Sequence, residues 1–393
     1  MFVQNTDIKD YIHSCDVEKL PITYEDKMKI ELFGHKILVE KNEWLWHLHL
    51  KLTDVCNARC FFCVEQNSER EENAGKYVER VDLMLTEMEK AGILYSVSVT
   101  GGEPLLFNKF DALCEVLRKH DIKFLTMNTN AKYLYKHLDK IDGLFDFIDI
   151  SRHAISDQRN NEIFGADMPT LNELKTIKEN LKYTKMRLQC VLCDVNSIDD
   201  VMAYIKAYSF ADDISFRKLM KLDSRTGIVY DDKEELYNQI LEYAFNNFLF
   251  VEQTVQDYYV YEIWRCENTC ITFSYSNMKM LSEVEKHEDD SVCREFIIHP
   301  DGVVSGSWNK MIYSIGDKIE CIIPVNSQCL NMSNPNFYIK KGDVYIITDK
   351  DDFPDENSCH WYEMTSAENK SILISAWNDY PEHMILQECF EKK

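Results

Sequence analysis

Short apolar runs alternate with segments of helical spacing through the middle of the chain. The apolar runs predict six strands, at residues 44–52, 94–99, 122–127, 144–150, 186–192 and 213–219. The segments between them predict helices near residues 78–91, 108–119, 132–140, 170–183 and 198–208. Strands that alternate with helices favour a parallel sheet joined by right-handed crossovers.

The predicted fold class is α/β, an incomplete (β/α)6 TIM-like barrel. The alternative is an open doubly wound sheet, although the Gly-rich first turn of a nucleotide-binding unit is absent. In a barrel the chemistry lies at the carboxyl ends of the strands. We therefore expect one rim to be formed by residues 53–63, 100–104, 128–130, 151–153 and 220.

The two ends of the chain have a different pattern. Residues 27–32 and 35–40 alternate around Phe33-Gly34 and predict a small hairpin. After residue 223 we expect a helix at 232–248, aromatic-rich strands, a hairpin at 295–308 that turns at Pro300-Asp301-Gly302, and an acidic tail. The predicted division is an N-terminal hairpin extension (1–43), a barrel (44–223) and a C-terminal extension (224–393).

Composition narrows the class of partner. The 393 residues are 45% hydrophobic, and 44 basic against 67 acidic side chains give a formal net charge of −23. Such a surface repels a phosphate backbone, so neither bulk nucleic acid nor an anionic membrane is an expected partner. With no signal peptide and no apolar stretch of about 18 residues, we expect a reducing cytoplasm. Fourteen cysteines are too dilute here for a disulfide scaffold.

Three of these cysteines lie within eight residues, directly after the first barrel strand. Cys56, Cys60 and Cys63 can hold three corners of a [4Fe–4S] cluster, which leaves one iron open for an exchangeable ligand. The alternative is zinc, held by the three thiolates together with His47 or His49.

A second motif, Thr100-Gly101-Gly102-Glu103-Pro104, follows the second strand. Glycines allow a backbone to approach a ligand closely. A neighbouring carboxylate can receive the cation of an α-amino group. By itself the motif is also compatible with an ordinary strand-to-helix turn.

Together the two motifs resemble the radical S-adenosylmethionine superfamily. Its signature, C-x3-C-x-aromatic-C, is matched by Cys56, Cys60, Phe62 and Cys63, and its GGEP motif by residues 101–104. The resemblance implies that a reduced [4Fe–4S] cluster cleaves S-adenosyl-L-methionine to methionine and a 5′-deoxyadenosyl radical, which removes a hydrogen atom from substrate. It also implies that Phe62 lies by the adenine and that Gly101, Gly102 and Glu103 hold the amino group.

The resemblance continues along the later strands. It implies that Asn128 contacts the ribose and carboxylate, that Ser151 binds the same cofactor, that Arg187 faces the cofactor carboxylate and that Met220 lies near the adenine. Each also has a plain structural reading, as a turn residue, an ion pair or part of the core. Arg152 and His153 follow Ser151 on the rim, where His153 is either functional or a buried structural residue.

Within the superfamily, the motif order is most similar to the branch of the GTP 3′,8-cyclase and the SPASM/Twitch maturases. Residues 293–307 resemble their auxiliary-cluster hairpin, with Ser307 where a second cysteine is expected. Serine is a poor iron ligand, so the sequence leaves open whether the chain binds a second iron–sulfur cluster. The cysteines that could hold one are Cys266, Cys270, Cys293, Cys321 and Cys329.

The sequence favours a radical enzyme that modifies a peptide or natural-product precursor, with an electron donor such as flavodoxin or ferredoxin. The alternatives are modification of a nucleotide or small metabolite, or a non-catalytic iron–sulfur or zinc-binding protein. Cyclases of the GTP type carry an arginine pair in the hairpin and a terminal Gly-Gly. Here the hairpin reads Arg294-Glu295-Phe296-Ile297 and the chain ends in Lys392-Lys393.

Overall fold

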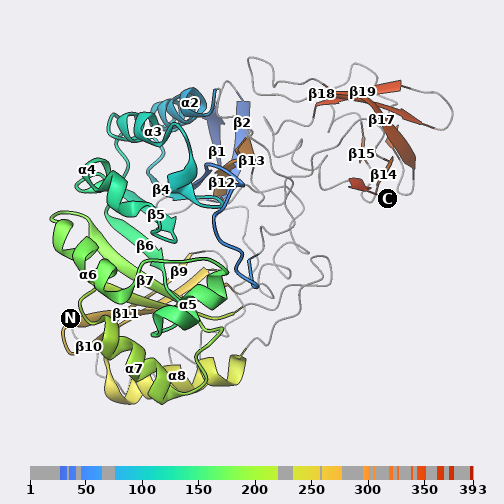
Figure 1. Ribbon diagram of the computed structural model, residues 1–393. Coiled ribbons are helices and arrows are strands. Elements are labelled where there is room, and N and C mark those ends of the chain that lie inside the picture. The colour runs from blue at the N-terminus through green and yellow to red at the C-terminus, as the bar shows by residue number, and fades with distance from the viewer. Residues whose placement is uncertain are drawn as a thin grey trace.

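In a computed structural model, the chain is described at residues 27–32, 35–40, 46–63, 76–219, 233–256, 259–276, 295–300, 302, 304–305, 318–321, 325–326, 338–339, 343–350, 361–366, 371–375 and 390–392. Within these residues, eleven strands form one central sheet, in the order β13-β12-β3-β4-β5-β6-β7-β8-β11-β10-β9. Figure 1 shows this sheet with helices along one of its sides.

The six predicted barrel strands are all present, parallel and in sequence order. They are β3 (Trp46–Lys51), β4 (Tyr95–Thr100), β5 (Phe124–Thr129), β6 (Phe147–Ser151), β7 (Lys185–Val191) and β8 (Asp213–Arg217). The predicted helices correspond to α2 (Tyr77–Lys90), α3 (Phe110–Leu117), α4 (Leu138–Ile141) with the preceding 3-10 turn η5 (Leu134–His137), α6 (Leu171–Asn180) and α7 (Ile198–Tyr208). Two elements were not predicted, the 3-10 turn η4 (Pro104–Leu106) and helix α5 (Asp157–Phe164).

The sheet extends beyond these six strands on both sides. β11 (Thr269–Ser276) runs parallel to β8, and β12 (Glu295–Ile298) runs parallel to β3. Antiparallel partners complete it: β10 (Tyr259–Cys266) and β9 (Leu249–Gln256) beyond β11, and β13 (Val304–Ser305) beyond β12. Because β13 and β9 lie at opposite edges, the described sheet is an open barrel. The β12–β13 pairing confirms the predicted hairpin, which joins the sheet through β3.

The two faces of the sheet differ in character. Leu48 and Leu50 of β3 are fully buried in the apolar core with the helices, whereas His47 and His49 lie on the opposite face. We call the face that carries these histidines the inner face. Its side chains on the other strands include Ser96, Ser98, Thr126, Asp149, Arg187, Asp213, Ser215 and Thr272. Barrel interiors are usually filled by branched apolar side chains. Because the inner face here is polar, its side chains make polar contacts in place of apolar packing.

The remaining described elements lie outside the sheet. Strands β1 (Lys27–Leu32) and β2 (His35–Glu40) form the predicted antiparallel hairpin, and α8 (Glu234–Asn247) is the predicted helix after the barrel. A second sheet contains β14 (Lys318–Cys321), β17 (Val344–Lys350), β18 (Trp361–Ser366), β19 (Ser371–Ser375) and β20 (Phe390–Lys392), and a separate pair is formed by β15 (Val325–Asn326) and β16 (Tyr338–Ile339). In the part of the chain that the structure describes, no helix is long and apolar enough to cross a membrane.

Candidate functional site: the cysteine loop

The three clustered cysteines lie on the loop that leaves the carboxyl end of β3. Cys56, Cys60 and Cys63 are half-buried thiols, and none of the three is in a disulfide bond. The Cys63 amide donates to the Cys60 carbonyl at 3.0 Å, and the Ala58 amide donates to the Cys56 sulfur at 3.4 Å. Burial, followed by the neighbouring thiols of Cys63 and Cys56, raises the pKa of Cys60 to about 12. The three sulfurs therefore share one partly enclosed region.

The Gly-Gly-Glu-Pro motif packs directly against this loop. The Gly102 amide donates to the Thr53 carbonyl at 2.6 Å, and the Glu103 amide donates to the Val55 carbonyl at 2.9 Å. A Cβ atom at Gly102 would lie 2.3 Å from the Val55 oxygen, and one at Gly101 would lie 2.6 Å from the Thr53 oxygen. Glycine is therefore required at both positions for the Gly-Gly-Glu-Pro turn to approach the cysteine loop so closely. The amides of Gly102 and Glu103 are already hydrogen-bonded to carbonyls of that loop.

We expect Gly102→Ala to displace the cysteine loop, because the new Cβ overlaps a backbone carbonyl that cannot rotate away. The expected result is loss of iron binding at the loop, measured as iron retained after anaerobic reconstitution. Gly92→Ala is the matched control, since a Cβ there has nothing within 4 Å although its φ of +71° is unfavourable for alanine. Gly92→Ala should cost about 1–2 kcal/mol of stability and keep the iron. Equal iron in both variants would contradict the loop contact.

The Glu103 side chain connects β4 to β5. Its carboxylate is 1% exposed and accepts from the Thr129 hydroxyl at 2.6 Å, the Asn130 amide at 2.8 Å and the Leu105 amide at 3.2 Å. Burial raises the pKa of Glu103 to about 7, although these three donors favour the charged form. The predicted role of Glu103 in holding an amino group stays a prediction, and in the structure it joins two rim loops.

The raised pKa of Glu103 predicts a dependence of stability on pH. The folded state keeps this proton up to about pH 7, whereas the unfolded chain loses it near 4.5. The contribution is therefore complete below about pH 4.5 and is lost as pH rises through about 7. Relative to Glu103→Gln, the free energy of unfolding of the wild type should fall by about 3 kcal/mol over this range. Denaturant titrations at several pH values measure it, and identical pH slopes would contradict it.

Asn130 contacts the cysteine loop more closely than the predicted Asn128. The Asn130 amide group donates to the Asn57 side-chain oxygen at 2.9 Å and lies 4.0 Å from the Cys56 sulfur. Asn128 instead donates to the Ser98 hydroxyl at 3.2 Å on the inner face. Asn130 is therefore the residue of the segment 128–130 that contacts the cysteine loop, and the predicted role of Asn128 toward a cofactor stays a prediction.

The other predicted cofactor residues are dispersed. Ser151 ends β6 and is partly exposed. The Arg187 guanidinium donates to Asp213 at 2.6 Å and to Asp149 at 3.3 Å, so two carboxylates hold it. Met220 lies outside the described residues. The roles of Ser151, Arg187 and Met220 toward a cofactor stay predictions.

Arg152 and His153 are both buried. Arg152, at 1% exposure, donates to the Tyr208 hydroxyl at 2.6 Å and pairs with Asp157 at 2.5 Å. His153 is 3% exposed, and burial lowers its pKa to about 3, with the charge of Arg152 as a second cause. A neutral histidine with this pKa is a poor proton donor near pH 7. Its ring lies 5.0 Å from that of Phe62.

The contacts around the cysteine loop bear on the choice between an iron–sulfur cluster and a zinc ion. Over the described parts of the chain, no group of three or more His, Cys, Asp and Glu side chains is placed to hold a single metal ion. The histidines considered for zinc have other partners: His47 bonds the Ser96 hydroxyl at 2.8 Å, and His49 bonds Glu295 at 2.9 Å. A four-iron cluster is larger than one ion, so its cysteines stand further apart. The all-thiol donor set fits such a cluster.

The cysteines that could hold a second cluster do not lie together in the part of the chain that the structure describes. Cys266 is opposite Thr269 across the β10–β11 hairpin, whereas Cys270 is opposite Arg265. Alternation places Cys266 on the core face and Cys270 on the inner face, so these two thiols cannot bind one cluster. Cys321 lies in β14 of the second sheet, and Cys293, Ser307 and Cys329 lie outside the described residues.

Comparisons with known proteins match the part of the chain that carries the cysteine loop. Residues 50–192 match the radical SAM superfamily. The chain is 31% identical over 121 residues to a probable GTP 3′,8-cyclase of Metallosphaera sedula (30% of this chain, 38% of that protein), and 29% identical over 164 residues to one of Sulfurisphaera tokodaii (40% and 51%). The chain thus spans about half or less of the length of these curated relatives.

Solved structures show the same fold. The crystal structure of Streptococcus suis SuiB bound to S-adenosylmethionine has a TM-score of 0.50 at 19% identity, over 69% of this chain and 61% of SuiB. SuiB bound to the precursor peptide SuiA has a TM-score of 0.50 at 18% identity, over 69% and 62%. Residues 50–192, in which the cysteine loop and the Gly-Gly-Glu-Pro turn pack together, therefore form a domain that matches the radical SAM superfamily.

Proposed function

We propose that the chain is a radical SAM enzyme whose cysteine loop holds one [4Fe–4S] cluster through Cys56, Cys60 and Cys63. The observation that carries the proposal is the contact between this loop and the Gly-Gly-Glu-Pro turn, fixed by two backbone hydrogen bonds of 2.6 and 2.9 Å. When bound, the cluster supplies the electron that cleaves S-adenosylmethionine reductively. The protein's own part is to position the thiols and to hold Glu103 and Asn130 at the same rim.

Anaerobic purification of the full chain tests this proposal. We expect about four irons, with matching sulfide, per chain and release of 5′-deoxyadenosine on addition of S-adenosylmethionine and dithionite. Dithionite stands in for the expected flavodoxin or ferredoxin, so the assay does not depend on identifying the natural donor. A protein that binds zinc alone and releases no 5′-deoxyadenosine would refute it.

A peptide is the substrate class that the charges support best. The chain carries a net charge of −23. On the inner face, Asp149 and Asp213 share a single arginine partner, Arg187. The hairpin strand β12 contributes Glu295, buried against His49. Two aspartates against one arginine leave this part of the inner face with an excess of negative charge, which favours the basic side chains of a peptide over a triphosphate.

The nucleotide alternative is favoured by one observation, the sequence similarity to probable GTP 3′,8-cyclases. That similarity covers 30% to 40% of the chain, whereas the likeness to SuiB, solved with a precursor peptide, covers 69%. To separate the two, the reconstituted protein is given S-adenosylmethionine and dithionite with either GTP or short Lys-rich peptides. We expect stimulation of 5′-deoxyadenosine release by peptide, and stimulation by GTP alone would reverse the order.

We expect the triple variant Cys56→Ala, Cys60→Ala, Cys63→Ala to retain almost no cluster iron. The reason is that Cys266 and Cys270 lie on opposite faces of their hairpin and cannot replace the lost site together. Iron and sulfide analysis after anaerobic reconstitution measures it against the wild type. Retention of a full cluster's iron by the triple variant would demonstrate a second site and overturn the single-cluster proposal.

A further inference from the structure

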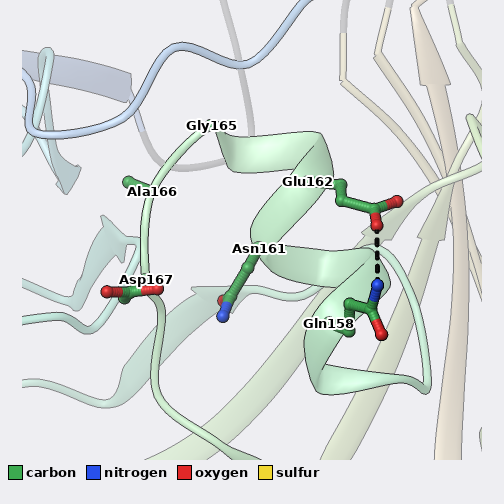
Figure 2. A pocket seen from close by; sticks show the side chains of 6 residues that line it. All are labelled: Gln158, Asn161, Glu162, Gly165, Ala166 and Asp167. Carbon is green, nitrogen blue, oxygen red and sulfur yellow. Dashed lines mark hydrogen bonds between the residues drawn. The ribbon is translucent and has the colours of Figure 1, made fainter.

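Helix α5 lies directly behind the cysteine loop. The Arg59 amide donates to the Phe164 carbonyl at 2.7 Å, in the last turn of the helix. The helix ends at Gly165 in a left-handed conformation with φ +61°, and a Cβ there would lie 3.6 Å from the Arg59 Cβ. Figure 2 shows this end of α5, where Gly165 leads the chain out of the helix. The loop residue before Cys60 is thus anchored to α5.

A second contact reaches the residue before Cys63. The His153 ring stacks on that of Phe164, with centroids 5.0 Å apart and planes 14° apart. The same ring meets Phe62 edge to face, at 5.0 Å and 83°. Since His153 is 3% exposed, its ring fills the space between α5 and the loop. Phe62 is therefore held through His153 by the same residue, Phe164, that anchors Arg59.

The His153 ring has its own fixed position. Its Nδ1 accepts from the Val191 amide at 3.2 Å, and its backbone amide donates to the Asn160 side-chain oxygen at 2.9 Å. Burial lowers the pKa of His153 to about 3, so the ring is neutral and this acceptor is kept near pH 7. Contacts from β7 and α5 thus orient a ring that does not itself carry charge.

We infer that His153 and Phe164 are positioning residues for the cluster, because they hold Arg59 and Phe62 on either side of Cys60. The inference rests on the proposed function, in which Cys60 is an iron ligand. Outer residues that orient metal ligands commonly matter about 10-fold or more for metal retention. Here the positioning acts through ring packing rather than through a hydrogen bond to a ligand.

Two substitutions at His153 separate packing from hydrogen bonding. His153→Phe keeps a ring between Phe164 and Phe62 but leaves the Val191 amide without its acceptor. His153→Gln keeps an acceptor but removes the ring. Phe164→Leu removes the ring on the helix side. The measurement is the rate at which a chelator removes iron from the reconstituted protein, beside the denaturation midpoint of the same sample.

We expect iron release to be about 10-fold faster in His153→Gln and Phe164→Leu. Iron release from His153→Phe should match the wild type even though its midpoint falls. Phe110→Leu is the matched control, because Phe110 is a buried aromatic of α3 in ring contact with another histidine, His137, at 5.3 Å. It should lower the midpoint without changing iron release.

The outcomes distinguish this inference from the proposed function. If the wild type binds no cluster, the proposed function fails first. If the wild type binds one and His153→Gln and Phe164→Leu release iron at the wild-type rate, only the positioning role is refuted. Faster release from Phe110→Leu as well would also refute it, because general destabilisation would then explain the effect.

Discussion

Cys60→Ala should abolish the release of 5′-deoxyadenosine while the barrel remains folded. Cys60 is a half-buried residue on a loop, outside the apolar core, so its loss costs little packing. It is also the middle of the three thiols, and its neighbours Arg59 and Phe62 are held by α5 and His153. A cluster that loses one of three protein ligands loses the geometry on which an open iron depends.

The matched control is Cys114→Ala. Cys114 is fully buried in α3, within the apolar core and away from the motif loops. Its truncation should lower stability by about 1 kcal/mol and leave cofactor cleavage intact. Circular dichroism and the 5′-deoxyadenosine assay on both variants measure the contrast. Full turnover by Cys60→Ala would refute the ligand assignment.

Arg187→Leu should produce the largest loss of stability. The Arg187 side chain is 20% exposed, and its partners Asp149 and Asp213 are 6% and 5% exposed. Removing one partner of a buried ion pair leaves an uncompensated charge and typically costs about 3–5 kcal/mol. Thr272 bonds Asp213 but carries no charge to replace the guanidinium.

This loss should depend on pH with a definite sign. Burial raises the pKa of Asp149 to about 6 even with Arg187 present, although Arg187 opposes the rise. Without Arg187 the folded-state pKa rises further, so the variant becomes less stable as pH rises through that pKa and recovers in acid. Urea titrations between about pH 5 and pH 8 test it, with Arg217→Leu, an exposed arginine, as control. Equal midpoints for Arg187→Leu and the control would contradict the paired network.

The elements that were predicted correctly are those with a clear local pattern of apolar and polar residues or a recognisable cap. The hairpin of β1 and β2 and the six barrel strands follow from apolar alternation and from short apolar runs. The start of α6 follows from its capping box, and both bonds between Thr170 and Glu173 are present. The observed ends of the elements differ from the predicted ends by a few residues, because the periodic pattern that identifies an element fades at its termini.

Helix α5 lacked such a signal. Its sequence, Asp-Gln-Arg-Asn-Asn-Glu-Ile-Phe, has its apolar residues only at the end, so it shows no helical period. Ser156 caps its start and Gly165 ends it in the left-handed conformation, and these two residues were the available clues. The pairings of β11 with β8 and of β12 with β3 are long-range, so no local pattern specified them.

The site was predictable in its motifs and not in its contacts. Spacing identified Cys56, Cys60 and Cys63 and the Gly-Gly-Glu-Pro turn. It did not show that Gly102 is needed by the cysteine loop itself, or that the carboxylate of Glu103 is enclosed by β5. Such contacts depend on which strand ends meet in the folded sheet, and one sequence without its tertiary structure does not specify them.

The central claim is that the loop of Cys56, Cys60 and Cys63 holds a cluster with an iron open to S-adenosylmethionine. The most direct test is the electron paramagnetic resonance spectrum of the anaerobically reduced full chain, recorded with and without S-adenosylmethionine. We expect a [4Fe–4S] signal that changes when S-adenosylmethionine is added and that is absent from Cys60→Ala. A signal that S-adenosylmethionine leaves unchanged, or one that persists in Cys60→Ala, would contradict the claim.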